Sequence, residues 1–106
     1  MIKEIQLLNV SERVYEKYKR SVKNNGNISL DTCRRKLTRN FILGTEVMSD
    51  YENQYIVRKY GKLRIFVDMK DMNIVNIENR KENSHRCYIN PRERDELNKL
   101  LGLENK

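Results

Sequence analysis

The sequence predicts an α+β fold in a single domain that spans residues 1–106. Apolar residues recur with the helical period in three segments, and they form short strand-like runs at the N-terminus and between residues 55 and 80. A chain of 106 residues is long enough for one core of modest depth. We expect an N-terminal strand, two helices, a three-stranded antiparallel meander and a C-terminal helix, in that order.

The first strand is expected at about residues 2 to 8, in the Ile- and Leu-rich segment "IKEIQLLNV". Ser11 is placed to cap a helix, because Val14, Tyr18 and Val22 follow it at helical spacing. The segment "NNGN" should end this helix.

The second helix is expected over residues 29–43, with Ser29 as its N-cap and Gly44 as its C-terminal stop. Its apolar residues share one face and should be buried. They are Leu30, Cys33, Leu37 and Phe41.

The segment "YIVRKYGKLRIFVD", residues 55–68, predicts a hairpin with Gly61 and Lys62 as a two-residue turn. That turn fixes the register. It places these residues opposite each other: Tyr60 and Leu63, Lys59 and Arg64, Arg58 and Ile65, Val57 and Phe66, Ile56 and Val67, Tyr55 and Asp68. Like charges opposite each other are unfavourable in a sheet, so the Lys59–Arg64 pair needs either an anion between them or full solvation.

The chain then continues through a turn at "MKDM" into a third strand, "NIVNIENR", and ends in a helix. Asn90 should cap this helix, with Pro91 in its first turn and one apolar stripe of Leu97, Leu100 and Leu101. The periods of the helices and strands agree on a single core. In that core we expect Leu63, Ile65 and Val67 to face Leu37 and Phe41.

The net charge of +7 is concentrated in one segment, residues 13–39, which holds nine Lys or Arg against two acidic residues. This placement favours a surface that faces a polyanion, so we expect nucleic-acid binding with a strong salt dependence. The candidate nucleic-acid-binding residues are Lys17, Arg20, Arg34, Arg35, Lys36, Arg39 and Lys62. Two cysteines without a CxxC pair, and no apolar run of about 18 residues, predict a cytoplasmic protein with no membrane partner.

The sequence predicts neither a metal site nor a cofactor site. No His, Cys or Asp cluster has metal-ligand spacing, the four glycines do not form a phosphate loop, and His85 is isolated. Arginine, lysine and tyrosine remain, and these can contact phosphates and stack on bases. They can also serve metal-independent RNA cleavage, in which cations stabilise the developing oxyanion.

The segment "YIVRKYGKLRIFVDMKDMNIVNIENRKENSHRCY" resembles the C-terminal sheet of the RelE-like toxin family, and the order of elements along the chain is also similar. The resemblance implies a ribosome-dependent mRNA endonuclease that a cognate antitoxin neutralises. It also implies candidate catalytic residues at the matching positions, which are Arg58, Lys59, Arg64, Arg80, Lys81 and Tyr88. This sequence departs from the family pattern in its long polar stretch before Tyr88 and in the charge carried by its helices.

A DNA-binding protein is the alternative interpretation. The helix at residues 29–43 would be a recognition helix that presents Arg34, Arg35, Thr38 and Arg39 to the major groove, and the hairpin at residues 55–68 would be a wing. A third interpretation is a small protein-binding factor, such as one from a mobile element, whose basic face docks an acidic partner. The oligomeric state is left open.

Overall fold

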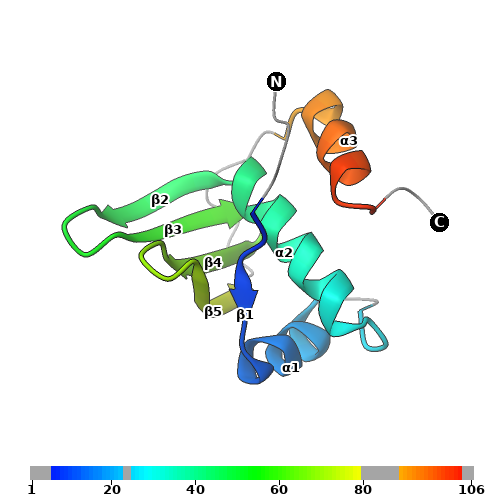
Figure 1. Cartoon of the computed structure of the whole chain (residues 1–106), viewed down its shortest axis with the longest axis horizontal. Coiled ribbons are helices and arrows are strands. Elements are labelled where there is room, and N and C mark those ends of the chain that lie inside the picture. The colour runs from blue at the N-terminus through cyan, green and yellow to red at the C-terminus, as the bar shows by residue number, and fades with distance from the viewer. Residues whose placement is uncertain (1–5, 23–24, 80–88, 104–106) are drawn as a thin grey trace.

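The computed structural model describes residues 6–22, 25–79 and 89–103. Within them a five-stranded sheet packs on one face against the helices α1 (Glu12–Ser21) and α2 (Leu30–Leu43) (Figure 1). The third helix, α3 (Pro91–Leu100), packs against α2. None of the helices in this part of the chain is long and apolar enough to cross a membrane.

The sheet has the strand order β1-β5-β4-β3-β2. Its strands are β1 (Asn9–Val10), β2 (Thr45–Asp50), β3 (Tyr55–Tyr60), β4 (Leu63–Asp68) and β5 (Asn73–Asn79). β1 is parallel to β5, and the other neighbours are antiparallel. The α+β class and the expected order of elements are confirmed, and β2 adds a fourth strand to the expected three-stranded meander.

The N-terminal strand is shorter and later than the expected residues 2 to 8. Residues 1–5 lie outside the described residues, and residues 6–8 are not in a strand. Side chains of α2 satisfy the backbone of Leu8 instead of a neighbouring strand, because its N–H donates to Thr38 Oγ1 at 3.0 Å and its carbonyl accepts from Arg34 Nε at 2.8 Å. Leu8 is thereby anchored in the core at 2% exposure.

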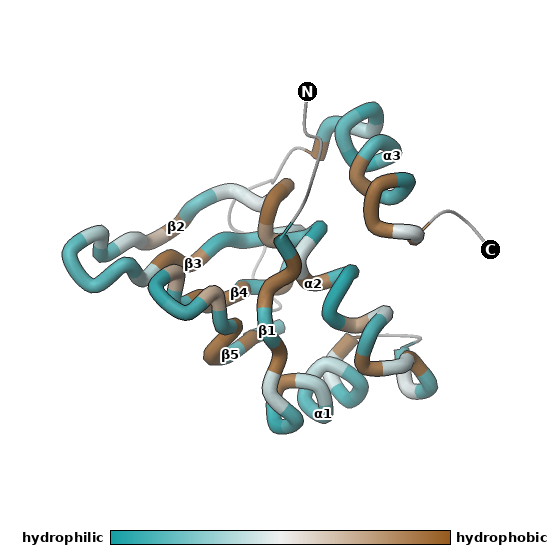
Figure 2. The backbone as a smooth tube through the Cα atoms, viewed as in Figure 1, coloured by the Kyte–Doolittle hydropathy of each residue, from teal (hydrophilic) through white to brown (hydrophobic). Residues whose placement is uncertain are grey.

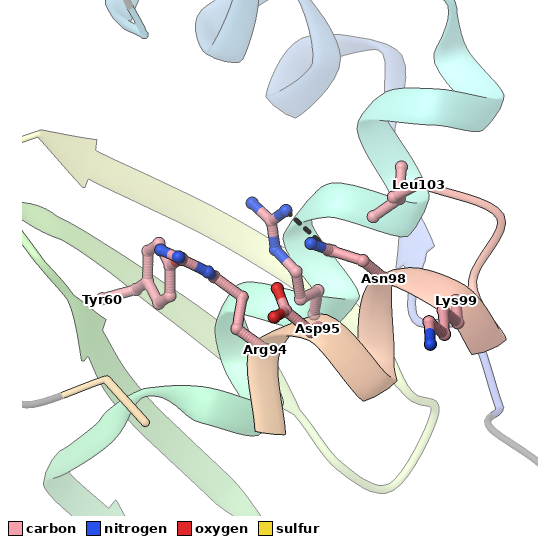
Figure 3. A pocket seen from close by; sticks show the side chains of 7 residues that line it. Tyr60, Arg94, Asp95, Asn98, Lys99 and Leu103 are labelled. Atoms are coloured by element: carbon pink, nitrogen blue, oxygen red, sulfur yellow. Dashed lines mark hydrogen bonds between the residues drawn. The ribbon is translucent and has the colours of Figure 1, made fainter. Parts of the chain in front are cut away.

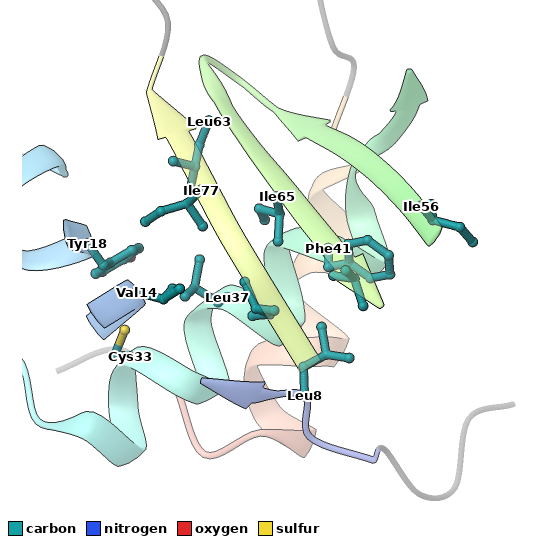
Figure 4. Packing of buried hydrophobic residues seen from close by; sticks show 12 residues of the cluster. Leu8, Val14, Tyr18, Cys33, Leu37, Phe41, Ile56, Leu63, Ile65 and Ile77 are labelled. Atoms are coloured by element: carbon teal, nitrogen blue, oxygen red, sulfur yellow. The ribbon is translucent and has the colours of Figure 1, made fainter. Parts of the chain in front are cut away.

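The core joins the inner face of the sheet to α1 and α2 (Figure 4). Leu63, Ile65 and Val67 are buried in one cluster with Leu37 and Phe41, as expected. Two residues of the expected apolar stripes are exposed instead, Leu30 by 47% and Leu100 by 48%. Both lie at a helix end, Leu30 as the first residue of α2 and Leu100 as the last residue of α3.

The register of the β3–β4 hairpin is confirmed at all six pairs, from Tyr55 opposite Asp68 to Tyr60 opposite Leu63. Gly61 adopts a φ of 62°, the left-handed value that the first residue of the turn requires. The expected caps are also confirmed, since Ser11 Oγ accepts from the Val14 N–H, Ser29 Oγ from the Thr32 N–H, and Asn90 Oδ1 from the Arg92 N–H.

Gly44 ends α2 in an extended conformation, with φ of −70°, so backbone strain does not require glycine there. A close approach does. A Cβ atom at this position would lie 2.9 Å from the Asn40 carbonyl oxygen and 3.0 Å from the Lys59 carbonyl oxygen. Glycine therefore lets the end of α2 pass directly over β3.

Helix α1 covers the edge of β5 beyond its short pairing with β1. Three polar contacts at successive turns of α1 join the two elements. Arg13 Nη2 donates to the Val75 carbonyl at 2.7 Å, Lys17 Nζ donates to Asn76 Oδ1 at 3.1 Å, and Asn79 Nδ2 donates to the Ser21 carbonyl at 2.7 Å. Two cations of the basic segment therefore protect a sheet edge from pairing with other chains. The other edge of the sheet is β2, and the loop that joins β2 to β3 is hydrophilic (Figure 2).

Candidate nucleic-acid interface

The face of the sheet that points away from the helices is called the outer sheet face. Side chains alternate between the two faces of a strand, and Ile56, Ile65 and Val67 belong to the core. The outer sheet face therefore carries the intervening residues of β3 and β4, which are Tyr55, Val57, Lys59, Arg64, Phe66 and Asp68.

Close to the Gly61–Lys62 turn, this face carries a row of polar and charged residues that crosses four strands. In register order it runs from Thr45 on β2 through Lys59 and Arg64 to Glu78 on β5. Lys59 is only 9% exposed, whereas Arg64 is half-buried. Glu78 supplies the carboxylate nearest to Arg64 in the register, so the row contains two adjacent cations and one anion. Its formal charge of +1 keeps the row attractive to a phosphate.

Aromatic side chains lie on the same face, farther from the Gly61–Lys62 turn than this row. Phe66 and Tyr55 are both half-buried, and Phe66 lies opposite Val57 in the register. Burial raises the pKa of the Tyr55 phenol, and the carboxylate of Glu78 adds to the shift. Cations beside an accessible aromatic ring are the combination that binds the phosphates and bases of a single strand.

Arg58 does not join this row. Because neighbouring residues of a strand alternate in direction, Arg58 points to the helix side while Lys59 points outward. Its Nη1 donates to the Phe41 carbonyl at 3.0 Å, and its guanidinium lies 4.4 Å from the centre of the Phe41 ring. Of the candidate catalytic residues, the structure thus brings together Lys59 and Arg64 and separates Arg58 from them. Arg80, Lys81 and Tyr88 lie outside the described residues.

The arginines of α2 hold other parts of the fold in place. Arg34 donates to the Leu8 carbonyl at 2.8 Å and to Asn9 Oδ1 at 3.1 Å. Arg35 donates to the Leu101 carbonyl at 2.7 Å and pairs with Asp31 at 2.8 Å. These two guanidinium groups fasten the segment before β1 and the end of α3 to α2. Thr38, a third expected groove contact, is 1% exposed. The contacts count against the interpretation of α2 as a recognition helix, which needs these side chains to reach base edges.

The remaining candidate nucleic-acid-binding residues differ in their surroundings. Lys17 contacts Asn76, and Lys36 Nζ donates to Asn25 Oδ1 at 3.2 Å. Arg20 on α1 and Lys62 at the tip of the β3–β4 turn are exposed. Most partners of the basic segment are neutral amides and carbonyls, which hold the cations in position without cancelling their charge.

A family model named YorE matches residues 8–100. The chain belongs to the YorE family. The match runs from the segment before β1 to the last residue of α3, and so includes every helix and strand described here. No curated protein matched the chain, and no solved structure matched it.

This YorE-family fold also contains a cavity of about 570 Å³ where α2, α3 and the end of β3 meet (Figure 3). It is lined mainly by Arg39, Tyr60, Arg94, Asp95, Asn98 and Lys99. Arg39 is the only one of these that the sequence singled out. Tyr60 and the α3 residues carried no local signal, because the cavity forms only when three elements distant in sequence come together.

Proposed function

We propose that the protein is directed to RNA and binds the sugar–phosphate backbone on its outer sheet face. The observation that carries the proposal is the direct opposition of Lys59 and Arg64 across β3 and β4. Two adjacent cations attract a phosphate. Phe66, on the same face, offers a ring on which an unpaired base can stack.

Single-stranded RNA fits this arrangement better than duplex DNA. A sheet face with cations and aromatic rings contacts phosphates and unstacked bases at the same time. The helix that would have to enter a major groove instead has Arg34 and Arg35 hydrogen-bonded to backbone carbonyls within the protein.

The RelE-like resemblance adds metal-independent cleavage to the proposal. In that reaction the RNA 2′-oxygen bonds to the adjacent phosphorus and the bond from phosphorus to the 5′-oxygen breaks, which leaves a cyclic phosphate and a 5′-hydroxyl. A base accepts the proton of the 2′-hydroxyl, and an acid delivers a proton to the departing oxygen. Lys59 and Arg64 would stabilise the charge that develops on the phosphate oxygens.

The proposal is tested by titrating a fluorescently labelled single-stranded RNA with the wild-type protein at increasing salt concentrations. Log affinity should fall linearly with log salt, and Arg64→Ala should reduce the magnitude of the slope by roughly 0.7 for the loss of one phosphate contact. Lys70→Ala is the matched control, because Lys70 is an exposed cation in the turn at the far end of β4. Equal effects of the two substitutions, or an absence of RNA binding, would contradict the proposal.

A further inference from the structure

The cavity between α2, α3 and the end of β3 lies on the helix side of the sheet, so it is separate from the outer sheet face. Tyr60 points into it from the last position of β3, and Arg94, Asn98 and Lys99 line it from α3 (Figure 3). Its volume of about 570 Å³ is within the usual range of small-molecule sites.

One wall of the cavity is fixed by hydrogen bonds. Arg39 Nη1 donates to Asn98 Oδ1 at 3.0 Å, while its Nε and Nη2 donate to Asn40 Oδ1 at 3.0 and 2.9 Å. The Arg39 guanidinium also lies 5.8 Å from the centre of the Tyr60 ring. Both hydrogen-bond partners are neutral amides, so they hold the Arg39 guanidinium in place without cancelling its positive charge. Since its carbonyl oxygen is the acceptor, Asn98 keeps its amide N–H groups available to a ligand.

The other wall consists of exposed side chains and is basic. Arg94, Asp95 and Lys99 are exposed residues of α3 that line the cavity. Together with Arg39, the lining holds three cations and one carboxylate, which is a net charge of +2. The cations attract an anion, and the single carboxylate offers an acceptor for hydroxyl groups.

We infer that this cavity binds a ribonucleotide, with its phosphate at Arg94, its base against the Tyr60 ring and its ribose hydroxyls at Asp95. Each part of the ligand then meets a group of the matching chemistry, since a guanidinium group binds phosphate and aromatic rings stack on bases. The ligand is either a free nucleotide or an unpaired nucleotide of a bound RNA strand. The free-nucleotide form does not depend on the proposed function.

The position of the cavity allows the RNA form as well. Tyr60 directly follows Lys59 on β3, and the exposed Lys62 lies at the tip of the turn between β3 and β4. A strand that crosses Lys59 and Arg64 on the outer sheet face can therefore pass around this turn. Its next nucleotide would then reach the cavity on the helix side.

Calorimetric titrations with AMP, UMP, adenosine, inorganic phosphate and a short 5′-phosphorylated RNA test the inference. AMP or UMP should bind more tightly than adenosine or phosphate alone. Tyr60→Leu should weaken nucleotide binding roughly 5- to 150-fold, the range expected for one lost stacking contact, and leave phosphate binding unchanged. Tyr60→Phe keeps the ring and should keep the affinity, which separates stacking from a loss of folding.

The charged wall has its own matched pair of variants. Arg94→Ala should weaken AMP and phosphate binding together, whereas Arg92→Ala, which changes an exposed cation of α3 outside the cavity lining, should not. Saturable binding of AMP assigns the site to free nucleotides, and binding of the phosphorylated RNA alone assigns it to an RNA strand. No Tyr60-dependent binding of any probe would overturn the inference. Because Arg64 lies on the other face, loss of RNA binding in Arg64→Ala with AMP binding retained separates this inference from the proposed function.

Discussion

Lys59 and Arg64 face each other across β3 and β4, and Glu78 on β5 lies opposite Arg64. The two cations are on the side of the sheet that no described helix covers. This pairing gives the outer sheet face a local positive charge that does not depend on the larger excess in residues 13–39. The proposed RNA site therefore depends on the strand register, while many cations of the basic segment stabilise the fold.

Arg34→Ala should destabilise the protein more than it weakens RNA binding. The substitution removes the donors to the Leu8 carbonyl and to Asn9 Oδ1, and hydrogen bonds from a charged group typically contribute about 1.5 to 3 kcal/mol. Urea unfolding should show this loss in the free energy of unfolding. Arg20→Ala is the control, because Arg20 is an exposed cation of the same basic segment. Unchanged stability together with a loss of duplex DNA binding would instead support the recognition-helix interpretation.

Gly44→Ala should lower the free energy of unfolding by about 1 to 3 kcal/mol, as overpacking does in a core. The added Cβ would lie too close to the carbonyl oxygens of Asn40 and Lys59, so α2 and β3 would have to separate. Gly26→Ala is the matched control, because no atom lies within 4 Å of its added Cβ. Thermal unfolding of both variants measures the difference. Equal melting temperatures would mean that α2 and β3 can move apart enough to accept the added Cβ without a loss of stability.

The stability should decrease in alkaline solution because of Cys33. Burial raises the pKa of this thiol from 9.0 to about 11, so the unfolded chain loses the proton first as the pH rises. The stabilisation is complete below pH 9.0 and is lost progressively toward pH 11, by up to about 3 kcal/mol. Urea unfolding at several pH values should show a shallower decline for Cys33→Ala. Tyr18, whose pKa burial raises to about 12, adds a further decline above pH 10.0 in both proteins. Parallel curves for the two proteins would refute a role for the thiol.

Expression of the wild-type protein in growing cells tests the cleavage activity that the RelE-like resemblance implies. Wild type should arrest growth and generate new mRNA 5′ ends within translated regions. Arg64→Ala combined with Tyr88→Phe should do neither, while accumulating as a folded protein. Cleavage that persists in this variant, or no harm from either protein, would remove the endoribonuclease from the proposal and leave RNA binding as the function to test.

The β3–β4 hairpin could be predicted in full because a two-residue turn at Gly61 and Lys62 fixes every pair that follows from it. The sequence does not predict β2, because apolar and polar residues do not alternate along it. Five of its six residues are exposed, including Val47 by 42% and Met48 by 50%. β2 pairs with the side of β3 that does not pair with β4, and this pairing becomes visible only in the folded sheet.

The roles of the cations depended even more on contacts between distant parts of the chain. Residues 13–39 indicated a basic surface, but their partners lie far away in sequence, as the contact from Arg35 to the Leu101 carbonyl shows. Charge counts cannot distinguish a guanidinium that faces solvent from one that donates to a carbonyl. The strand register could be predicted and placed Lys59 beside Arg64, whereas the cavity around Tyr60 could not, because α3 reaches it from the other end of the chain.

RNA binding at the outer sheet face is tested most directly by NMR of the backbone amides, with uniformly ¹⁵N-labelled protein and a short single-stranded RNA. The largest shifts should occur on the outer sheet face, at Lys59, Arg64 and Phe66, and the amides of Arg34 and Arg35 on α2 should change little. Shifts concentrated on α2, or a spectrum that RNA leaves unchanged, would contradict RNA binding at this face.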